Sequence, residues 1–391
     1  MKNTPRHNYK KGHYVELLQS GEPYFAACEK AIDEAKYFIH FQTYIVDDDE
    51  TGRRITDALK RAAERGIKVY FLLDAFGGRS FVKHLVKEVE NAGIFFRKFS
   101  PAFIVKGFQL SLRLHHKVLL VDGDIAIIGG MNAANRYHGT PDYKEWLDFA
   151  LLVKGPECAH VFNILKRIWN KAFFSKKERS REIIRHHFSY TDNVKVKVVQ
   201  NNWYRNKIEI LRSYRYALKH SHDRMIIMAS YFLPGRYERK LFRDASRRGV
   251  DIKIVLPSES DAPVFKMATS FLYDLILRNN INLYEYLPSN LHAKVATVDG
   301  KWSTIGSYNL NHLSDYGSIE MNVDILDNRF SEQFEKLLLD IIKKDCRQVT
   351  FDNFNSHRTW FYKFFSWFSY QTIRILMRLM FLLTTKRRKS L

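Results

Sequence analysis

Two stretches of this 391-residue chain repeat the same order of sequence patterns, and this repeat is the feature that most constrains the fold. Each copy has an apolar run, an amphipathic run ending in Arg-Gly, further apolar and helical runs, and finally Leu-His-x-Lys-Val-x-x-Val-Asp-Gly. The segments are 37–46, 67–73, 81–91, 94–96 and 114–123 in the first copy, and 225–233, 251–257, 264–278, 281–286 and 291–300 in the second. The shared terminal motif argues against chance similarity between two unrelated segments.

The alternation of apolar runs with helical patterns predicts the α/β fold class. The chain is too long for one ordinary hydrophobic core, so we expect two similar domains. Each domain is expected to be a mixed, largely parallel sheet flanked by helices. We place the first domain at residues 1–190, the second at 191–350, and a separate C-terminal segment at 351–391.

The two His-x-Lys motifs also agree in the residues that come after them. The first copy contains His115, Lys117, Asp122 and Asn132, and the second contains His292, Lys294, Asp299 and Asn309. In both copies Lys follows His by two positions, Asp follows Lys by five, and Asn follows Asp by ten. One such motif is a weak signal, whereas two copies at the same offsets inside repeated segments are a strong one.

This spacing indicates phosphate chemistry. Residues two apart in a strand point to the same side, so each His and its Lys project together. Asp-Gly then predicts a tight turn into a further strand, which ends at Gly-Gly in the first copy and Gly-Ser in the second. A lysine and an asparagine amide suit phosphate oxygens, and a nearby histidine can attack phosphorus or donate a proton.

The charge of the chain favours a polyanionic partner. It has 63 Lys and Arg against 42 Asp and Glu, a net charge of +21. A surplus of this size suits anionic lipid headgroups or nucleic acid, and charge alone does not choose between them.

Several other features bound the class of protein. The three cysteines, Cys28, Cys158 and Cys346, are far apart and form no CxxC pair, so neither a disulfide framework nor a zinc site is expected. No carboxylate cluster has magnesium spacing, and we expect neither a metal nor another cofactor. The N-terminus lacks the apolar region of a signal peptide, and no apolar stretch is long enough to cross a membrane.

Both motifs resemble the HKD signatures of the phospholipase D superfamily. The wider pattern resembles the bacterial cardiolipin synthase branch, in its short form without N-terminal transmembrane helices. The resemblance runs from about Gly21 to Asn322 and includes FQTYIVDDDETG, GGMNAANRY and GSYNLNHLSDYGSIEMN. It implies two similar domains related by a pseudo-twofold axis, with both motifs in one cleft.

The resemblance also implies a role for each site residue. His115 is expected to attack phosphorus and form a phosphohistidine, while His292 acts as general acid and base. Asp148 and Glu320 match the acidic residues that orient the two histidines. The side chains expected to hold phosphate oxygens are Lys117, Lys294, Asn132 and Asn309. Asp122 and Asp299 complete the two catalytic motifs, although we expect them to act as structural anchors for the turns.

The C-terminal stretch from Arg358 to Lys389 predicts an amphipathic helix. Its longest uncharged apolar piece, Phe364 to Ile373, is too short to span a bilayer. Gln371, Arg374 and Arg378 fall on one narrow stripe of the helix, with aromatic and aliphatic residues around the rest. This pattern suits a helix lying in the interface of an anionic membrane. The alternative is a helix packed on the protein's own domains or on a second subunit.

The leading interpretation is a cardiolipin synthase-type phosphatidyltransferase that moves a phosphatidyl group between phosphatidylglycerol molecules. The expected partner is the anionic phospholipid surface, on the cytoplasmic face of a bacterial membrane. Alternatives that keep the site are a phospholipase D with water as acceptor and a phospholipase D-like nuclease. A catalytically inactive membrane scaffold is a further alternative, which the two intact motifs argue against. The aromatic C-terminal helix favours lipid over nucleic acid, and the oligomeric state is left open.

Overall fold

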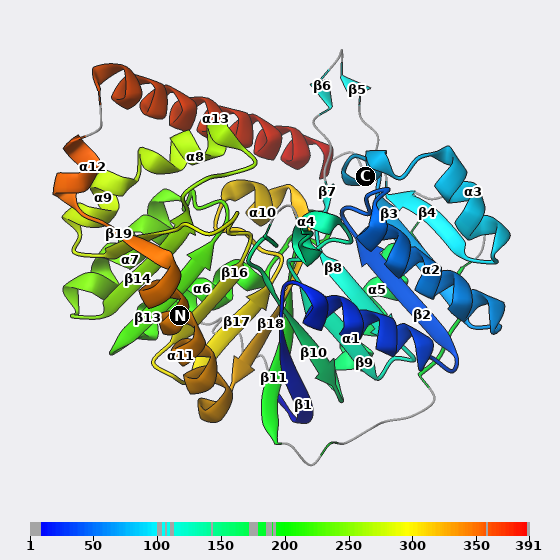
Figure 1. Ribbon diagram of the computed structural model, residues 1–391. Coiled ribbons are helices and arrows are strands. Elements are labelled where there is room, and N and C mark those ends of the chain that lie inside the picture. The colour runs from blue at the N-terminus through cyan, green and yellow to red at the C-terminus, as the bar shows by residue number, and fades with distance from the viewer. Residues whose placement is uncertain are drawn as a thin grey trace.

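The computed structural model describes residues 9–99, 104–105, 108–109, 113–141, 144–171, 179–184, 190, 193–356 and 359–388 (Figure 1). The strands of the first half are β1 (Lys10–Gln19), β2 (Phe38–Thr43), β3 (Lys68–Asp74), β4 (Phe95–Phe99), β5 (Ile104–Val105), β6 (Phe108–Gln109), β7 (Arg113–Leu114), β8 (Lys117–Val121), β9 (Ile125–Gly129) and β10 (Phe149–Lys154). Its helices are α1 (Glu22–Asp33), α2 (Glu50–Glu64), the short 3-10 turn η1 (Gly77–Ser80), α3 (Lys83–Asn91), α4 (Asn135–His138) and α5 (Glu157–Trp169).

The second half repeats this order. Its strands are β11 (Val194–Asn202), β12 (Lys207–Ile208), β13 (Arg224–Ala229), β14 (Asp251–Pro257), β15 (Asn282–Tyr286), β16 (Lys294–Val298), β17 (Trp302–Gly306), β18 (Ser318–Leu326) and β19 (Cys346–Val349). Its helices are η2 (Trp203–Arg205), α6 (Glu209–His220), α7 (Arg236–Arg247), α8 (Pro263–Ser270), α9 (Tyr273–Arg278), α10 (His312–Tyr316), α11 (Asn328–Asp345), α12 (Phe351–Ser356) and α13 (Trp360–Arg388).

The two halves build equivalent mixed sheets, as the sequence predicts. In the first half β2, β3 and β4 are parallel, and β8 then returns antiparallel beside β2. In the second half β13, β14 and β15 are parallel, and β16 returns antiparallel beside β13. Parallel pairing is thus confined largely to the strands before each motif, while the motif strands and those after them run antiparallel. Three-residue loops at residues 122–124 and 299–301 explain why each motif strand pairs antiparallel with the strand that follows it, because short loops of this kind join antiparallel neighbours.

The two sheets join edge to edge through the N-terminal strand. β1 pairs antiparallel with β10 of the first half and, near its start, with β11 of the second. In Figure 1 these three strands meet at the centre of the molecule, with the two sets of helices on either side. Strands from both halves therefore form one continuous sheet among the described residues.

One hydrophobic core is shared by the halves, and each half also has a core of its own. The shared core packs α5 and α11 on strands of both halves and includes Phe149, Trp169, Met321 and Phe334. A second core lies under α1, α2 and α3, and a third lies under α6, α7 and α9. Because the shared core holds both sheets rigidly, the ends of the two motif strands are fixed relative to each other.

The C-terminal helix α13 lies along the outside of the second half, over α8 (Figure 1). Ser366, Ser369, Tyr370 and Ile373, at the helical spacing of one face, are buried against the domain. The sequence alternative of a helix packed on its own domain therefore holds for this face. Six aromatic side chains on the opposite face are exposed, namely Trp360, Phe361, Phe364, Phe365, Trp367 and Phe368.

Candidate active site

The two motifs meet because the segments before them cross over to the other half. Leu114 of β7 pairs in parallel with Ile319 of β18, and the backbone N–H of His115 donates to the carbonyl of Ile319 at 3.0 Å. An equivalent parallel bridge joins Leu147 of the first half to Leu291 of the second. In each bridge the next residues along both chains lie side by side. The histidine of one motif therefore stands beside the acidic residue of the opposite half.

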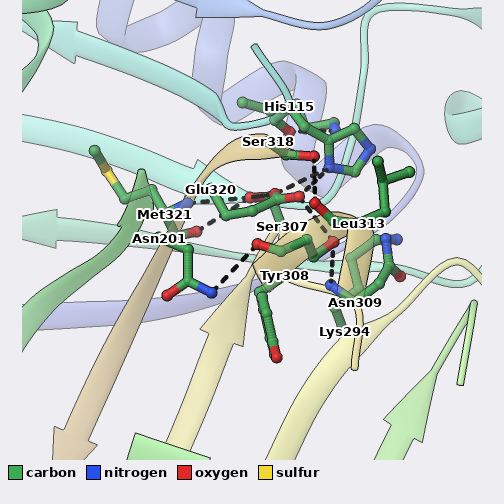
Figure 2. A network of polar contacts seen from close by, with 12 residues as sticks. His115, Asn201, Lys294, Ser307, Tyr308, Asn309, Leu313, Ser318, Glu320 and Met321 are labelled. Carbon is green, nitrogen blue, oxygen red and sulfur yellow. Dashed lines mark hydrogen bonds and ion pairs between the residues drawn. The ribbon is translucent and has the colours of Figure 1, made fainter. Parts of the chain in front are cut away.

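His115 accordingly bonds Glu320 rather than an acid of its own half. Its Nδ1 lies 2.9 Å from Oε2 of Glu320, a carboxylate that is fully buried. Figure 2 shows Glu320 between the His115 ring and the hydroxyl of Ser307, which donates at 2.5 Å. The hydroxyl of Ser314 donates to the same carboxylate at 3.0 Å. Glu320 is thus held as a hydrogen-bond acceptor, which directs the His115 proton to Nδ1 and leaves Nε2 with its lone pair.

His292 is oriented in the same way by Asp148. Its Nδ1 lies 2.6 Å from Oδ2 of Asp148, and both side chains are almost completely buried. Burial raises the pKa of Asp148 to about 7, against the opposing charge of Lys294. Gly130 stands where the second half has Ser307, and a Cβ there would lie 2.3 Å from Oδ2 of Asp148. The shorter aspartate therefore requires glycine, and the longer Glu320 accommodates serine.

Both histidines are neutral near pH 7. Burial lowers the pKa of His115, although the Glu320 carboxylate acts in the opposite direction. The pKa of His292 falls further, because burial is reinforced by the charges of Lys294 and Lys117. A neutral imidazole is the form that can attack phosphorus, so the electrostatics of this site favour nucleophilic chemistry.

The two lysines occupy equivalent buried positions at the starts of β8 and β16. Each donates to the backbone carbonyl of its own motif histidine, which fixes the ammonium group close to the ring. Burial lowers the pKa of Lys117 to about 7 and that of Lys294 to about 8. An anionic phosphate nearby would favour the charged form of both, which suits electrostatic stabilisation of phosphate oxygens.

A cavity of about 750 Å³ opens over both histidines. This volume is within the range of about 300–1,000 Å³ typical of ligand sites. Its walls come from both halves and combine apolar side chains such as Phe76, Trp146 and Phe265 with His115 and His292. The structure therefore brings together the two motifs that the sequence predicted to share one cleft.

The two asparagines line this cavity but are used differently. Asn132 is already engaged, because its Oδ1 accepts from the N–H of Ile45 at 3.0 Å and its Nδ2 donates to the hydroxyl of Tyr137 at 2.8 Å. The buried Oδ1 of Asn309 has no hydrogen-bond partner among the described residues. Asn309 is therefore the better placed of the two to accept a hydrogen bond from an alcohol hydroxyl in the cavity.

The aspartates of the motifs lie away from the histidines. Asp122 follows the five-residue strand β8 and sits about 16 Å along the strand from Lys117. Its carboxylate accepts from three consecutive backbone N–H groups, those of residues 36–38. Asp299 does the same for residues 222–224. Neither lines the cavity, so their inclusion in the catalytic motifs reflects anchoring of the turn and not contact with substrate.

We expect Asp122→Ala to reduce stability and to leave chemistry intact. Three charge-assisted hydrogen bonds are lost, and alanine is strained at the left-handed φ of 55°. A loss of about 2 kcal/mol lowers the unfolding midpoint by about 4–8 °C in a domain of this size. Turnover per folded molecule should remain within about threefold, as in the control Asp340→Ala on the surface of α11. A loss of turnover without loss of thermal stability would contradict this anchoring role.

Sequence reasoning missed four side chains that surround the histidines. Tyr44 packs edge-on against His115, with ring centroids 5.0 Å apart. Tyr137 and Trp146 contact the His292 ring, and Arg136 lies over both of these aromatic rings. The repeat contains a signal for Tyr137. It follows Asn132 by five positions, and Ser314 follows Asn309 by the same number, so the two copies carry different side chains at equivalent positions.

Among the described residues, none of the helices combines the length and the hydropathy needed to span a bilayer. The same residues contain no group of three or more His, Cys, Asp or Glu side chains placed to hold a metal ion.

Two matched α/β halves, each contributing the histidine of a His-x-Lys motif to one cavity, define a phospholipase D-type protein. A family model described as cardiolipin synthase, phospholipase D-like domain, matches residues 29–169 and 214–342. The chain is 31% identical to cardiolipin synthase B of Escherichia coli K12 over 367 residues, covering 90% of this chain and 86% of that protein. Cardiolipin synthase B of Salmonella typhimurium is 30% identical, with the same coverage.

Solved structures show the same fold. The phosphatidylserine synthase of Haemophilus influenzae superposes with a TM-score of 0.66 at 13% identity and covers 95% of this chain and 94% of its own. The polyphosphate kinase of Porphyromonas gingivalis superposes with a TM-score of 0.58 at 14% identity, covering 86% of this chain and 48% of its own.

The present chain belongs to the phospholipase D superfamily, in its cardiolipin synthase branch, and is an enzyme of the phosphatidyltransferase type.

Proposed function

We propose that this enzyme is a cardiolipin synthase that transfers a phosphatidyl group between two phosphatidylglycerol molecules through a phosphohistidine. The observation that carries the proposal is the crossed arrangement of the site. Two neutral histidines face one cavity, and each is oriented by a buried carboxylate from the opposite half. Such a pair suits a two-step transfer, in which one imidazole attacks while the other exchanges protons with the two alcohols.

In the first step Nε2 of His115 attacks the phosphorus of one phosphatidylglycerol. The N–P bond forms as the bond from phosphorus to the headgroup oxygen breaks. His292 must carry a proton on Nε2 for this step, which the anionic phosphate favours once it is bound, and it gives that proton to the departing glycerol oxygen. In the second step His292 takes a proton from a headgroup hydroxyl of the second phosphatidylglycerol. That oxygen attacks phosphorus, the N–P bond breaks, and cardiolipin is released with His115 regenerated.

The two buried lysines of the motifs stabilise the negative charge on the phosphoryl oxygens during both steps. Lys117 and Lys294, each held beside its own motif histidine, supply positive charge to the phosphoryl oxygens. Asn309 lines the cavity, and its Oδ1, which has no partner among the described residues, can accept from an alcohol hydroxyl. Burial strengthens each of these interactions, because it excludes competing water. Asn132 has no phosphate contact in this proposal, because its amide already bonds the backbone N–H of Ile45 and the hydroxyl of Tyr137.

A lipid substrate is supported by the surface next to the cavity. Helix α13 packs on α8 and α10, and each of these helices contributes to the cavity wall, through Phe265 and Leu313. The exposed aromatic side chains lie in the N-terminal part of α13, at the outer edge of the second half, and the helix runs from there toward the centre of the molecule (Figure 1). Aromatic side chains together with a net charge of +21 suit the interface of an anionic membrane. We infer that residues 351–391 hold the enzyme peripherally on the cytoplasmic face of the membrane.

The aromatic face of α13 can be tested by a triple substitution, Phe364→Ser, Trp367→Ser and Phe368→Ser. These side chains are 44–53% exposed, so their loss should leave folding intact. Each contributes up to about 1.5–3 kcal/mol on full burial in lipid, so we expect binding to phosphatidylglycerol vesicles to weaken at least about tenfold. Co-sedimentation measures this. The matched control replaces Tyr216, Leu326 and Leu339, exposed on other elements, with serine. Equal binding by both variants would exclude α13 as the membrane surface.

The activity is tested by the lipid products. Purified enzyme is incubated with phosphatidylglycerol vesicles, with and without phosphatidylethanolamine, and the products are resolved. Cardiolipin plus glycerol supports the proposal, whereas phosphatidic acid as the main product identifies a hydrolase. Cleavage of DNA without any lipid turnover would identify a nuclease.

A further inference from the structure

The two halves of the site differ at one position that touches a catalytic histidine. Tyr137 and Ser314 each follow their motif asparagine by five residues. Ser314 supports the carboxylate, because its hydroxyl donates to Glu320 at 3.0 Å and accepts from the N–H of Asn309 at 3.3 Å. Tyr137 reaches the other side of its histidine, with its hydroxyl 3.4 Å from Nε2 of His292.

The direction of this contact follows from the neighbours of the tyrosine. Nδ2 of Asn132 donates to the Tyr137 hydroxyl at 2.8 Å, so the hydroxyl proton is directed toward His292. Nδ1 of His292 has two polar neighbours, Oδ2 of Asp148 at 2.6 Å and Nζ of Lys294 at 3.0 Å. We assign the ring proton to the shorter contact, as Nδ1–H donating to Asp148, so Nε2 is an acceptor. Burial raises the pKa of Tyr137, so the phenol keeps its proton. A distance of 3.4 Å is long, but such contacts commonly shorten when substrate binds.

Nε2 of His115 is the equivalent nitrogen in the first motif. No side chain in the described part of the chain hydrogen-bonds to Nε2 of His115, which lines the cavity. Tyr44 contacts this ring only edge-on through its aromatic ring. The pseudo-twofold site is therefore asymmetric at the two nitrogens that perform the chemistry.

We propose that Tyr137 is a positioning residue that engages Nε2 of His292 and so reserves this histidine for proton exchange, leaving His115 as the nucleophile. The hydroxyl competes for the lone pair of His292 and weakens it as a nucleophile. It also holds the ring so that Nε2 faces the leaving and entering alcohol oxygens. The inference rests on the proposed transfer reaction and adds a residue that assigns the two roles.

The test compares Tyr137→Phe with Tyr273→Phe. The control removes a buried hydroxyl that also bonds on two sides, to Lys266 and Glu285, but lies outside the cavity. We expect Tyr137→Phe to lower kcat for phosphatidylglycerol about 10- to 100-fold, with KM changed less than about twofold. The alkaline limb of the kcat/KM profile should move to higher pH, because a donor to the neutral form of His292 is lost.

Two measurements separate positioning from general damage to the fold. In ¹⁵N spectra, the Nε2 signal of His292 should move in Tyr137→Phe and stay in place in the control. With phosphatidyl-p-nitrophenol, whose leaving group needs no proton, the first burst of p-nitrophenolate should match that of the wild type.

Wild-type kcat, pH profile and ¹⁵N shift in Tyr137→Phe would overturn the inference while leaving the proposed transfer intact. If wild-type enzyme neither turns over phosphatidylglycerol nor releases p-nitrophenolate, the proposed function itself fails.

Discussion

Replacing either motif histidine with alanine is expected to abolish phosphatidyl transfer. His115→Ala removes the nucleophile and His292→Ala removes the proton carrier, so each should lower turnover of phosphatidylglycerol about 10³-fold or more. The double variant should keep about the same turnover as the less active single variant, because the effects of residues that act as a unit are strongly non-additive. Product formation on vesicles measures the effect. The control is His84→Ala, an exposed histidine on α3.

The separate roles of the two histidines can be read with phosphatidyl-p-nitrophenol. Its leaving group departs without a proton, so His292→Ala should still release about one equivalent of p-nitrophenolate and then stall as a covalent adduct on His115. His115→Ala should give no burst. The reverse pattern would make His292 the nucleophile. Wild-type turnover in either variant would exclude the two-histidine mechanism.

The second large effect is expected from the crossed carboxylates. Glu320→Gln places an amide beside Nδ1 of His115, and an amide N–H there forces the imidazole proton onto Nε2, the attacking atom. The analogous wrong-tautomer substitution in a catalytic triad costs about 10⁴-fold, so we expect a loss of about 10²- to 10⁴-fold. Asp148→Asn should act in the same way on His292.

The crossing itself is checked by ¹⁵N spectra of histidine-labelled enzyme. In Glu320→Gln the signals of His115 should change to the other tautomer, while those of His292 stay in place. Asp148→Asn should give the converse. A matched control is Glu332→Gln, an exposed carboxylate of the second half. If Glu320→Gln instead perturbed His292, each carboxylate would serve its own half and the crossed geometry would be wrong.

The sequence predicted the parts of the site that depend on local spacing. A period of two in a strand places His115 beside Lys117, and an Asp-Gly pair at the end of that strand predicts the turn at Asp122. These rules act over a few residues and hold in both halves. They also account for the α/β class, because alternating strands and helices allow few other arrangements.

The C-terminal helix was predicted only in part. Its amphipathic pattern identified an apolar surface, but not how that surface divides. The structure gives one face to the domain, through Tyr370 and Ile373, and leaves aromatic residues such as Phe364 and Phe368 exposed. Both faces carry apolar side chains, so hydropathy alone does not distinguish contact with protein from contact with lipid.

By itself, then, the sequence determined the repeated α/β halves, the two motifs and their phosphodiester chemistry. Only the tertiary structure decided which carboxylate bonds to each histidine, and which histidine has the Tyr137 hydroxyl beside its Nε2. The bond from Glu320 to His115 spans 205 positions and that from Asp148 to His292 spans 144. Such pairings depend on how β7 and β18 align across the shared core, and no periodicity within a single segment encodes that alignment.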